Sequence, residues 1–542
     1  MPHRLSQFGG LRARTIAAVA MAAVLAPALT TRAFEEGGKL DLRLRSRVEA
    51  DGRSRLIETL ASWAPGQTAM IVCDMWDLHH CLNAVRREKE MAPTMERVLK
   101  AARDRGVTII HAPSSCTDTY KDHPARKHAT ATPRSNKLPR DLASWCKVIP
   151  SEEKGTYPID QSDGGEDDDP AEHKKWADEL AAMGRNPRAP WKSQIDVLTI
   201  AEKDYISDNG EEIWSILEDR GIKNVILMGV HLNMCVLGRP FGLRQMAKNG
   251  KTVALMRDLT DTMYNPQRSP FVGHFAGTDL MVEHIEKYVA PTLTSDQIIG
   301  GKPFRYKDDT RPSVALLIAD DEYRTEATLP RFASEHLLKD YRVSYLLAPE
   351  GVRDALPAVG ELAEADLMVV SARRRVLPRE QLDAIRRFVA GGKPVVGIRT
   401  ASHAFAPRGG AKLPPGRDAW GGFDAEVLGG HYTNHHGAGP AVAVALAPGA
   451  ASHPILEGVD VSGLSGHGSL YLVSPLASSA TPLLVGSIPG QSPEPVAWTN
   501  APATGGRVFS TSMGQADDFG EPAFNRLLRN AIDWAAGRHS TK

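Results

Sequence analysis

VILMGVHLNMCV occupies residues 225–236 and divides into an apolar run, a glycine and a lone cysteine. The β-favouring run that ends at Gly229 predicts a buried strand, and the amphipathic, small-residue segment after Cys235 predicts a helix. Cys235 would then lie at the helix N-terminus, where unpaired N–H groups and the helix dipole favour a thiolate and can hold an oxyanion. The alternative is a small apolar side chain packed under the helix.

Two further apolar runs end in residues that could act with a thiol. AMIVCD, residues 69–74, ends at Asp74, and DVLTIAEK, residues 196–203, ends at Lys203. If both are strands of an open parallel sheet, their C-terminal ends share one edge with the end of the cysteine strand. Asp74, Lys203 and Cys235 should therefore lie within about 5 Å of one another.

From about residue 64 to 290, the chain resembles the isochorismatase-like cysteine hydrolases, whose Asp, Lys and Cys follow in this chain order. The resemblance implies that Asp74 is the general base, that Lys203 positions the acid and the thiolate, and that Cys235 is the nucleophile. It also implies a cis peptide bond before His231 and an oxyanion hole formed by the N–H groups of His231 and Cys235. The family commonly has threonine at the position of His231, which leaves substrate preference open.

Polar and aromatic residues follow the first strand and its predicted neighbour. The residues expected to shape a substrate pocket at the strand ends are Trp76, His79, His111, Tyr120 and Arg126. Nicotinamidases, within the same family, hold a divalent metal beside the triad, and the candidate ligands here are Asp77, His79 and His111. The nicotinamidase spacing is not reproduced, and the adjacent His79 and His80 would diverge by about 100° on a helix. We expect no cofactor and keep the metal as the alternative.

Composition bounds the partners. The chain has 542 residues, enough for two or three domains, and its 65 basic and 65 acidic residues balance. No basic patch indicates nucleic acid, so the expected partner is a small-molecule substrate, with homo-oligomer formation left open. Five cysteines are too few for a disulfide scaffold, although Cys116 and Cys146 lie in loop-like sequence and could pair.

The N-terminus predicts export. Arginines precede an apolar run over residues 15–29, and Thr31 and Ala33 supply the small residues that a signal peptidase requires. Because about 15 apolar residues are short for a membrane span, residues 1–33 are expected to be a cleaved signal peptide. The mature protein would be periplasmic or extracellular, with no stable membrane span.

The remaining boundaries follow from changes in composition. Residues 39–49 alternate leucine with charge, which predicts an edge strand or a surface arm, and residues 34–63 are expected to form this N-terminal arm. Within 64–290, the polar, proline-bearing stretch 112–192 carries aromatic anchors, and we expect it to fold over the strand-end pocket as a lid. Residues 291–312 are predicted to be a linker, and 313–542 a second domain.

In the second half, apolar runs such as 313–319 alternate with helical patterns such as 378–390, which predicts a doubly wound α/β domain. Arg399 follows the strand predicted over 394–398, where class I glutamine amidotransferase-like folds place the cysteine of a strained nucleophile elbow. Glutaminase activity is therefore not expected.

The motifs GGHYTNHH, PVAW and GRVFSTSMGQ make residues 313–538 similar to ThuA-like, trehalose-utilisation type domains. That family often has histidine at the position of Gln515. A site for a sugar-like ligand would be formed by Arg399, His403, His431, His435, His436 and Gln515. The alternative is that these histidines are structural.

The fold class is therefore predicted to be α/β, with two doubly wound, mainly parallel sheets: an isochorismatase-like, Rossmann-type three-layer domain and a class I glutamine amidotransferase-like domain. The expected function is an exported cysteine hydrolase that acts on a small amide or a related C–N or C–O substrate, with a ligand-binding second domain. The alternative is a non-catalytic carbohydrate-binding or surface interaction protein that retains two enzyme-like folds.

Overall fold

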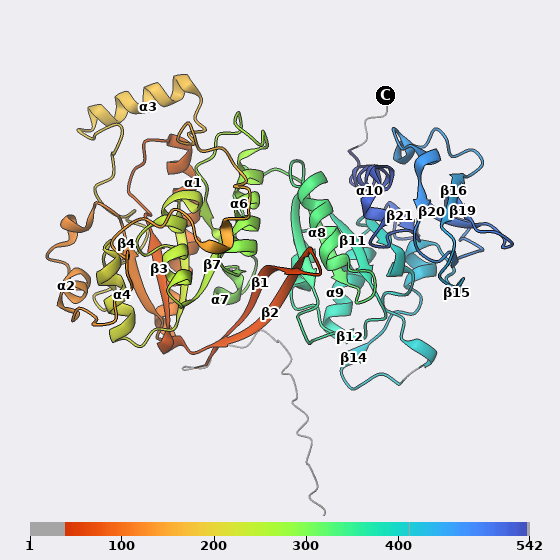
Figure 1. Ribbon diagram of the computed structural model, residues 1–542, viewed down its shortest axis with the longest axis horizontal. Coiled ribbons are helices and arrows are strands. Elements are labelled where there is room, and N and C mark those ends of the chain that lie inside the picture. Colours follow the sequence, from red (N-terminus) through yellow and green to blue (C-terminus); the bar gives the residue numbers. More distant parts are fainter. Residues whose placement is uncertain (1–37, 411, 539–542) are drawn as a thin grey trace, which may run out of the picture. The chain divides into compact units, whose positions relative to one another are not determined.

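The computed structural model describes residues 38–410 and 412–538 (Figure 1). The predicted signal peptide, residues 1–33, lies outside the described residues. Within them, no helix is both long enough and apolar enough to cross a membrane.

The first sheet has eight strands in the order β2-β1-β8-β7-β6-β3-β4-β5. The pairings from β8 to β5 are parallel, whereas β1 pairs antiparallel with both β2 and β8. The strands are β1 (Leu40–Ala50), β2 (Arg53–Trp63), β3 (Thr68–Cys73), β4 (Thr108–Ala112), β5 (Tyr205–Ile206), β6 (Asn224–Val230), β7 (Thr252–Asp261) and β8 (Thr292–Leu293). The associated helices are α1 (Leu82–Asp104), α2 (Pro124–Ala131), α3 (Pro170–Ala182), α4 (Gly210–Asp219), α5 (Leu243–Lys248), α6 (His274–Tyr288) and α7 (Asp296–Ile299).

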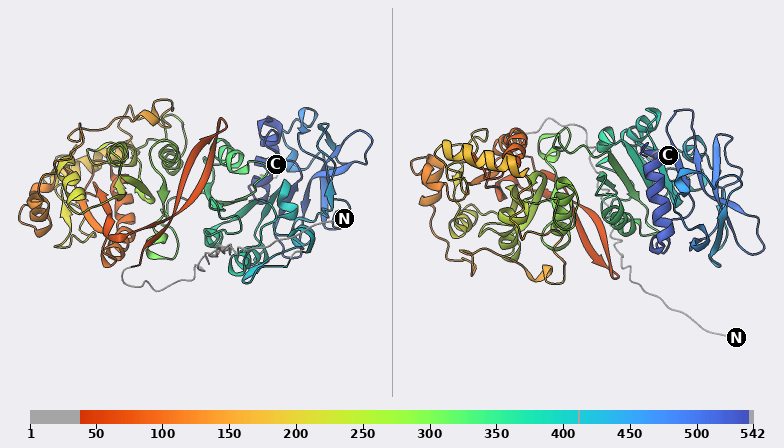
Figure 2. Two further views of the ribbon diagram at one scale, coloured as in Figure 1. Left: turned by 60° about the horizontal axis from the view of Figure 1, so that its bottom comes forward. Right: turned by 90° about the horizontal axis from the view of Figure 1, so that it is seen from above.

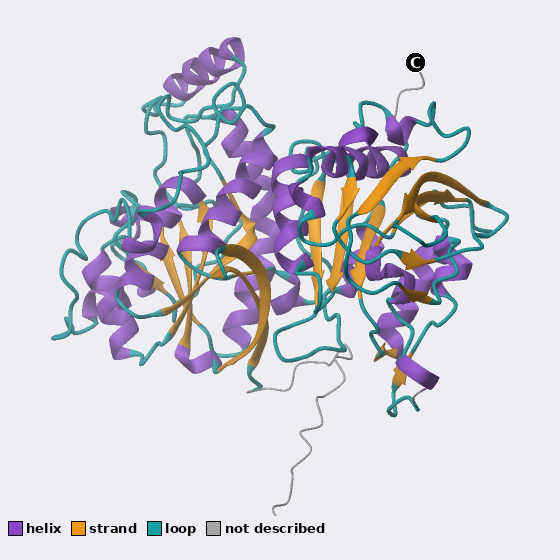
Figure 3. Ribbon diagram, turned by 45° about the vertical axis from the view of Figure 1, so that its right-hand side comes forward, coloured by secondary structure: helices purple, strands orange, loops and turns teal. Residues whose placement is uncertain are grey.

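Alternating side chains of the central strands supply two apolar layers, as strand geometry requires. Met70 of β3 and Met228 of β6 pack with α1 on one face, whereas Ile71 and Leu227 pack with α4, α5 and α6 on the other. The first domain is therefore a three-layer α/β structure with helices on both faces of the sheet (Figure 3).

The second sheet has nine strands in the order β10-β9-β11-β13-β21-β20-β19-β16-β17. It is parallel from β10 to β21 and antiparallel beyond. Its strands are β9 (Ser313–Ala319), β10 (Arg342–Leu347), β11 (Leu367–Ala372), β13 (Val395–Ile398), β16 (Val442–Leu446), β17 (Ser465–Gly466), β19 (Ala480–Ser487), β20 (Glu494–Asn500) and β21 (Val508–Thr511). The helices are α8 (Thr325–His336), α9 (Arg379–Ala390) and α10 (Pro522–Ala535), and two short ribbons pair β12 (Leu377–Pro378) with β14 (Arg417–Asp418) and β15 (Asn434–His435) with β18 (Tyr471–Leu472).

This sheet is also covered on both faces. Side chains of α8 and α10 pack on one face with Leu316, and those of α9 pack on the other with Leu317. The prediction of two α/β domains is confirmed. The sequence did not predict that one half of the second sheet is antiparallel.

Residues 34–63 were expected to form an edge strand or an arm. Their described part is the β1–β2 hairpin, prominent in both views of Figure 2, and β2 is an edge strand of the first sheet. One boundary prediction needs correction. Residues 291–312 were expected to be a linker, yet β8 within them joins the first sheet through Thr292 and Leu293. Those two residues are fully buried, so they belong to the first domain.

Candidate active site

Asp74 and Cys235 follow neighbouring parallel strands. Cys73, at the end of β3, pairs with Gly229 of β6, and Asp74 comes directly after it with a φ of 48°. Gly229 has a φ of 110°, and a Cβ there would lie 2.1 Å from the Cys73 carbonyl oxygen, so only glycine fits. Asp74 is fully buried and Cys235 is 8% exposed, which places both beneath the surface at the predicted sheet edge.

The Asp74 carboxylate is the centre of a small polar network. Its Oδ1 accepts a hydrogen bond from the Ser114 N–H at 2.8 Å, and its Oδ2 accepts from Arg239 Nε at 3.1 Å. Arg239 Nη2 lies 3.0 Å from the same oxygen. The Cys235 thiol also hydrogen-bonds to Asp74, and the Arg239 guanidinium contacts the sulfur as well. An acid, a thiol and a cation therefore meet at one point.

Burial has the largest effect on the protonation of Asp74 and Cys235. Burial raises the pKa of Asp74, while Arg239 and the hydrogen bonds from Cys235 and Ser114 oppose that rise. Burial and the nearby Asp74 carboxylate raise the pKa of the Cys235 thiol well above its usual range, against the effect of Arg239. The resting sulfur is therefore a neutral thiol hydrogen-bonded to a base.

This corrects the expectation of a thiolate at a helix N-terminus. Cys235 lies within a π-helical turn, Leu232–Val236, and α5 begins only at Leu243. Without a regular helix starting at the cysteine, no helix dipole offsets the cost of burying a charged sulfur. The implied cis peptide bond between Val230 and His231 is confirmed.

The structure does not bring Lys203 to Asp74 and Cys235. Residues 196–203, expected to form a strand, instead run through turns, and the strand next to β4 is β5. Lys203 is exposed, and no hydrogen bond or ion pair joins it to another residue within the described part of the chain. The cation beside Asp74 is Arg239.

Aromatic rings surround the turn that leads to Cys235. Trp76 stacks on Trp191 with ring centroids 4.5 Å apart, and its Nε1 donates to the Ser114 carbonyl. The His79 ring lies 5.9 Å from Trp76 and 4.8 Å from His231. Trp76 and His79 therefore lie near His231, at the start of the turn that carries Cys235.

Both of these histidines are buried and neutral. Burial above all lowers the pKa of His231 to about 3, and it lowers that of His79 well below its usual range. The His231 Nε2 is buried without a hydrogen-bond partner in the described structure. Such an unpaired buried nitrogen is costly, which marks it as a group that a ligand could satisfy.

Other predicted pocket residues are engaged elsewhere. His111 is fully buried between Gln194 and Asp204, at 2.9 and 3.3 Å. Arg126 pairs with Glu212. The Tyr120 hydroxyl group accepts a hydrogen bond from the Gln194 N–H. His111 and Arg126 therefore have structural roles, which corrects their assignment to the pocket.

The metal set Asp77, His79 and His111 does not assemble. Asp77 pairs with Arg185 at 2.8 Å, and His79 Nδ1 accepts from the Cys81 N–H. Among the described residues, the group with metal-like spacing is Cys81, Asp167 and Asp168, and these two carboxylates already bind Arg87 and the first N–H groups of α1. All five cysteines are free, so Cys116 and Cys146 form no disulfide.

The insertion 112–192, expected to form a lid, contacts Arg239 and the turn Leu232–Val236 that carries Cys235. The Arg239 guanidinium lies 4.7 Å from the Trp145 ring centre, and the Tyr157 hydroxyl donates to the Asn233 carbonyl at 3.1 Å. Trp176 is buried and packs beside α1, whereas Trp145 is 47% exposed. The outer face of Trp145 is therefore open to solvent.

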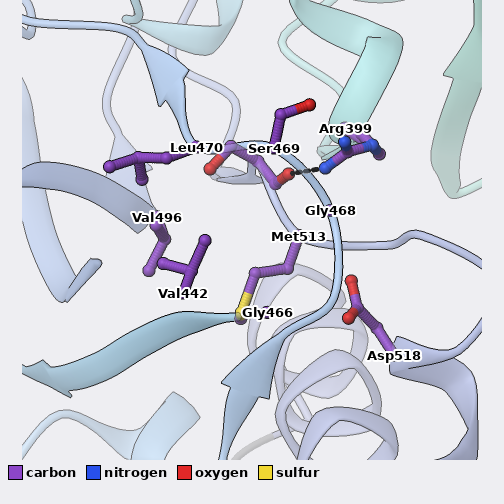
Figure 4. Close-up of a pocket in the computed structure, with 10 residues that line it drawn as sticks. Arg399, Val442, Gly466, Gly468, Ser469, Leu470, Val496, Met513 and Asp518 are labelled. Carbon is purple, nitrogen blue, oxygen red and sulfur yellow. Dashed lines mark hydrogen bonds between the residues drawn. The ribbon is translucent and has the colours of Figure 1, made fainter. Parts of the chain in front are cut away.

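In the second domain, Arg399 follows β13 with a φ of 47°, as expected of an elbow position. Its guanidinium lies 4.2 and 4.7 Å from the ring centres of Tyr323 and Tyr471, and its Nη1 donates to the Ser512 carbonyl at 2.8 Å. Figure 4 shows Arg399 beside Gly468 at the edge of a small pocket. Gly468 packs against it, since a Cβ there would lie 2.4 Å from the guanidinium.

The cavity beside Arg399 measures about 10 Å³, enough for one water molecule. Arg399 is only 3% exposed. No sugar-sized ligand fits against this guanidinium, which corrects its place in the predicted ligand site.

The histidines of that site are distributed around two tyrosines. His403 stacks on Tyr432 at 4.6 Å, and the exposed His435 stacks on Tyr471 at 5.9 Å. Exposed His431 and half-buried His436 lie in the same segment, while Gln515 accepts from the Asp517 N–H. His403 and His435 therefore both lie beside Tyr471, the tyrosine that also contacts Arg399.

Sequence reasoning missed Arg239 and Ser114. Arg239 stands four residues after Cys235, the spacing that brings side chains together on a helix, and this was the available signal. Ser114 contributes its backbone N–H, for which no side-chain signal exists.

Comparison with known proteins gives two family matches. Residues 68–296 match the isochorismatase domain model, and residues 335–535 match the ThuA model, described as trehalose utilisation. No curated protein matches the chain.

Three of the similar solved structures each cover a little under half of the chain. A ThuA-like protein from Bacteroides uniformis is 16% identical, with 43% of this chain and 95% of that chain covered and a TM-score of 0.33. A cysteine hydrolase from Pseudomonas syringae pv. phaseolicola is also 16% identical, with 43% and 92% covered and a TM-score of 0.27. An isochorismatase family protein from Burkholderia thailandensis is 14% identical, with 45% and 100% covered and a TM-score of 0.24. The chain thus combines an isochorismatase domain, matched over residues 68–296, with a ThuA domain, matched over residues 335–535.

Proposed function

We propose that the first domain is a cysteine hydrolase for small amides or related C–N or C–O substrates. The observation that carries this proposal is the buried contact of the Cys235 thiol with the Asp74 carboxylate, with Arg239 paired to both. Cys235 is the nucleophile, Asp74 the base, and Arg239 the cation that the family resemblance had assigned to Lys203.

The reaction begins when Asp74 takes the proton from the Cys235 sulfur as the sulfur attacks the carbonyl carbon. The carbonyl oxygen gains the electron pair, and backbone N–H groups of His231 and Cys235 are proposed to donate to it. Collapse of this intermediate breaks the C–N bond, and the leaving amine takes the proton from Asp74. A thioester on Cys235 remains.

Water completes the cycle. Asp74 removes a proton from the attacking water, the C–S bond breaks, and the sulfur recovers that proton as the acid product leaves. The raised pKa of Cys235 suits this order, because the thiol stays neutral until an electrophile is bound and the proton moves only with attack.

The test is a hydrolysis screen over small amides with the wild type, Cys235→Ala and Cys116→Ala. Cys116 is also a free, buried thiol and serves as the matched control. We expect ammonia or amine release from the wild type and Cys116→Ala, and none from Cys235→Ala. Equal turnover by Cys235→Ala would rule out the nucleophile.

We further propose that the protein is exported, on the strength of the arginines and apolar run of residues 1–33. Expression in a Gram-negative host should yield a mature N-terminus near residue 34 in the periplasmic fraction. Recovery of uncleaved chain from the cytoplasm alone would contradict this.

For the second domain we propose a sugar-like ligand held on aromatic rings. Support comes from exposed His435 and half-buried Tyr432, since flat rings of this kind offer an apolar face beside polar tips. Titration calorimetry of the full chain against sugars should show saturable heat that Tyr432→Ala abolishes. Sugar binding that survives this substitution would place the ligand elsewhere.

A further inference from the structure

A cavity of about 620 Å³ lies beside the turn Leu232–Val236, which carries Cys235 and is called the nucleophile turn below. Its volume is within the size range of small-molecule sites. The insertion forms one wall, including Trp145, Val148 and Tyr157. The opposite wall includes Met234, next to Cys235, and His284 of α6. The Cys235 side chain is not among the lining residues, so the cavity is separate from the hydrolytic centre.

The charged groups of this cavity are neutralised within the wall. Arg244 donates two hydrogen bonds of 2.7 Å to Glu152, and Lys147 and Asp160 contribute one charge of each sign. Burial alone would raise the pKa of Glu152, but hydrogen bonds from His284 and Arg244 outweigh burial and lower this pKa to about 2. The Glu152–Arg244 pair therefore stays ionised, and no excess charge is left to attract an ion.

The hydrogen-bonding groups indicate one donor on the occupant. His284 Nε2 lies 2.9 Å from Glu152 Oε1, and a carboxylate only accepts, so this nitrogen carries the proton. In the neutral ring Nδ1 is then an acceptor. Burial raises the pKa of Tyr157 to about 12, which keeps the phenol neutral and its proton directed at the Asn233 carbonyl.

The shape of the walls favours a flat occupant. The Tyr157 and His284 ring centres lie 5.3 Å apart in an edge-on arrangement, and apolar Val148 and Met234 complete the surface. Rings buried against such walls gain most of their binding free energy from apolar contact and ring packing.

We propose that this cavity is a second ligand site, which binds an uncharged, ring-bearing organic molecule that carries one N–H or O–H donor. The occupant contacts the insertion and the nucleophile turn together. Because Trp145 lines the cavity and also lies on Arg239, the occupant also alters the surroundings of Cys235.

The test uses indole and 2-naphthol as probes, with 2-naphthoate and 1-naphthalenemethylamine as the anionic and cationic analogues. Titration calorimetry of the full chain should give one site for each neutral probe and at least tenfold weaker binding of both charged analogues. Absence of saturable binding by either neutral probe would overturn the proposal. Equal binding of a charged analogue would overturn the ligand class.

Location is tested by filling the cavity from its exposed rim. Val148 is 52% exposed and lines the cavity, whereas Val197 is 40% exposed and does not. Val148→Trp should weaken both neutral probes at least tenfold and Val197→Trp less than twofold. Lys147→Trp, on the same rim, is the second variant should the first fail to fold. Undiminished binding in a folded rim variant would overturn the location.

Contact with the nucleophile turn has its own measurement. Saturating indole should change the rate of Cys235 alkylation by iodoacetamide at pH 8.5 at least threefold, measured on the Cys235 peptide by mass spectrometry. An unchanged rate with indole bound would overturn the link to Cys235.

Discussion

Replacing Arg239 by methionine should abolish most hydrolysis, whereas the same replacement of Lys203 should leave it intact. Arg239 Nε and Nη2 lie 3.1 and 3.0 Å from Asp74 Oδ2, and Asp74 is fully buried. Lys203 is exposed. The pair of variants therefore separates the cation seen beside the base from the one that the family pattern implies.

The magnitude follows from the burial of the acid. Removing one partner of a buried ion pair costs about 3–5 kcal/mol when the other charge is left behind. Asp74 can escape that cost by taking up a proton, so the substitution should raise its pKa further, and a protonated Asp74 cannot accept the thiol proton. Loss of a general base lowers kcat/KM by about 100-fold to 10,000-fold. Lys203→Met should change the free energy of unfolding by no more than about 0.5 kcal/mol.

The assay is the pH dependence of kcat/KM on the best amide from the screen, with thermal unfolding of each variant as the folding control. Activity requires ionised Asp74, so it should rise with pH, and in Arg239→Met this rise should move to higher pH. Arg239→Lys should recover part of the activity, because it restores the charge without the guanidinium fork. Full activity in folded Arg239→Met, or its loss in Lys203→Met, would refute this reasoning.

Three further predictions concern stability. Gly229→Ala should lower the free energy of unfolding in urea by about 3 kcal/mol, because the residue has a positive φ and its Cβ would clash with the backbone, whereas Gly250→Ala, which has a positive φ but open space, should lower it by about 1 kcal/mol. Similar losses in the two variants would show that the clash does not contribute. The pKa of Glu152 falls from 4.5 to about 2 on folding, so this carboxylate adds at most about 3 kcal/mol to the free energy of unfolding above pH 4.5, and this is lost as pH falls towards 2. Glu152→Gln should lose this pH dependence, measured as urea midpoints, and an unchanged pH profile would refute the prediction. Gly468→Ala should cost about 1–3 kcal/mol by displacing the Arg399 guanidinium, measured by thermal unfolding, and an unchanged Tm would show that the guanidinium moves freely.

The sequence was sufficient for the α/β class and for the position of the acid and the thiol. Long apolar runs bounded by glycine or charge, such as those before Asp74 and Cys235, became buried parallel strands. Such runs can be interpreted from local sequence alone. The backbone N–H and C=O groups of a buried apolar run form their hydrogen bonds only in a sheet or a buried helix, and the flanking residues exclude the helix.

The apolar run 196–203 shows where that reasoning fails. Leu198, and Ile195 directly before the run, do enter the apolar core, but through a turn and without strand pairing. Burial and backbone pairing are separate requirements, and apolar residues report only the first. Lys203 was consequently assigned to an edge that its segment does not reach.

The chemistry of the site was decided by tertiary structure. Whether Cys235 is a thiol or a thiolate depends on its burial and on the distance to Asp74 and Arg239, and none of these is encoded in the spacing of the three residues. Likewise, Arg399 occupies the elbow position that the sequence indicated, yet only packing between Tyr323 and Tyr471 closes the space beside it. Local pattern determines which backbone element a residue occupies, whereas long-range packing determines which side chains meet there and in what charge state.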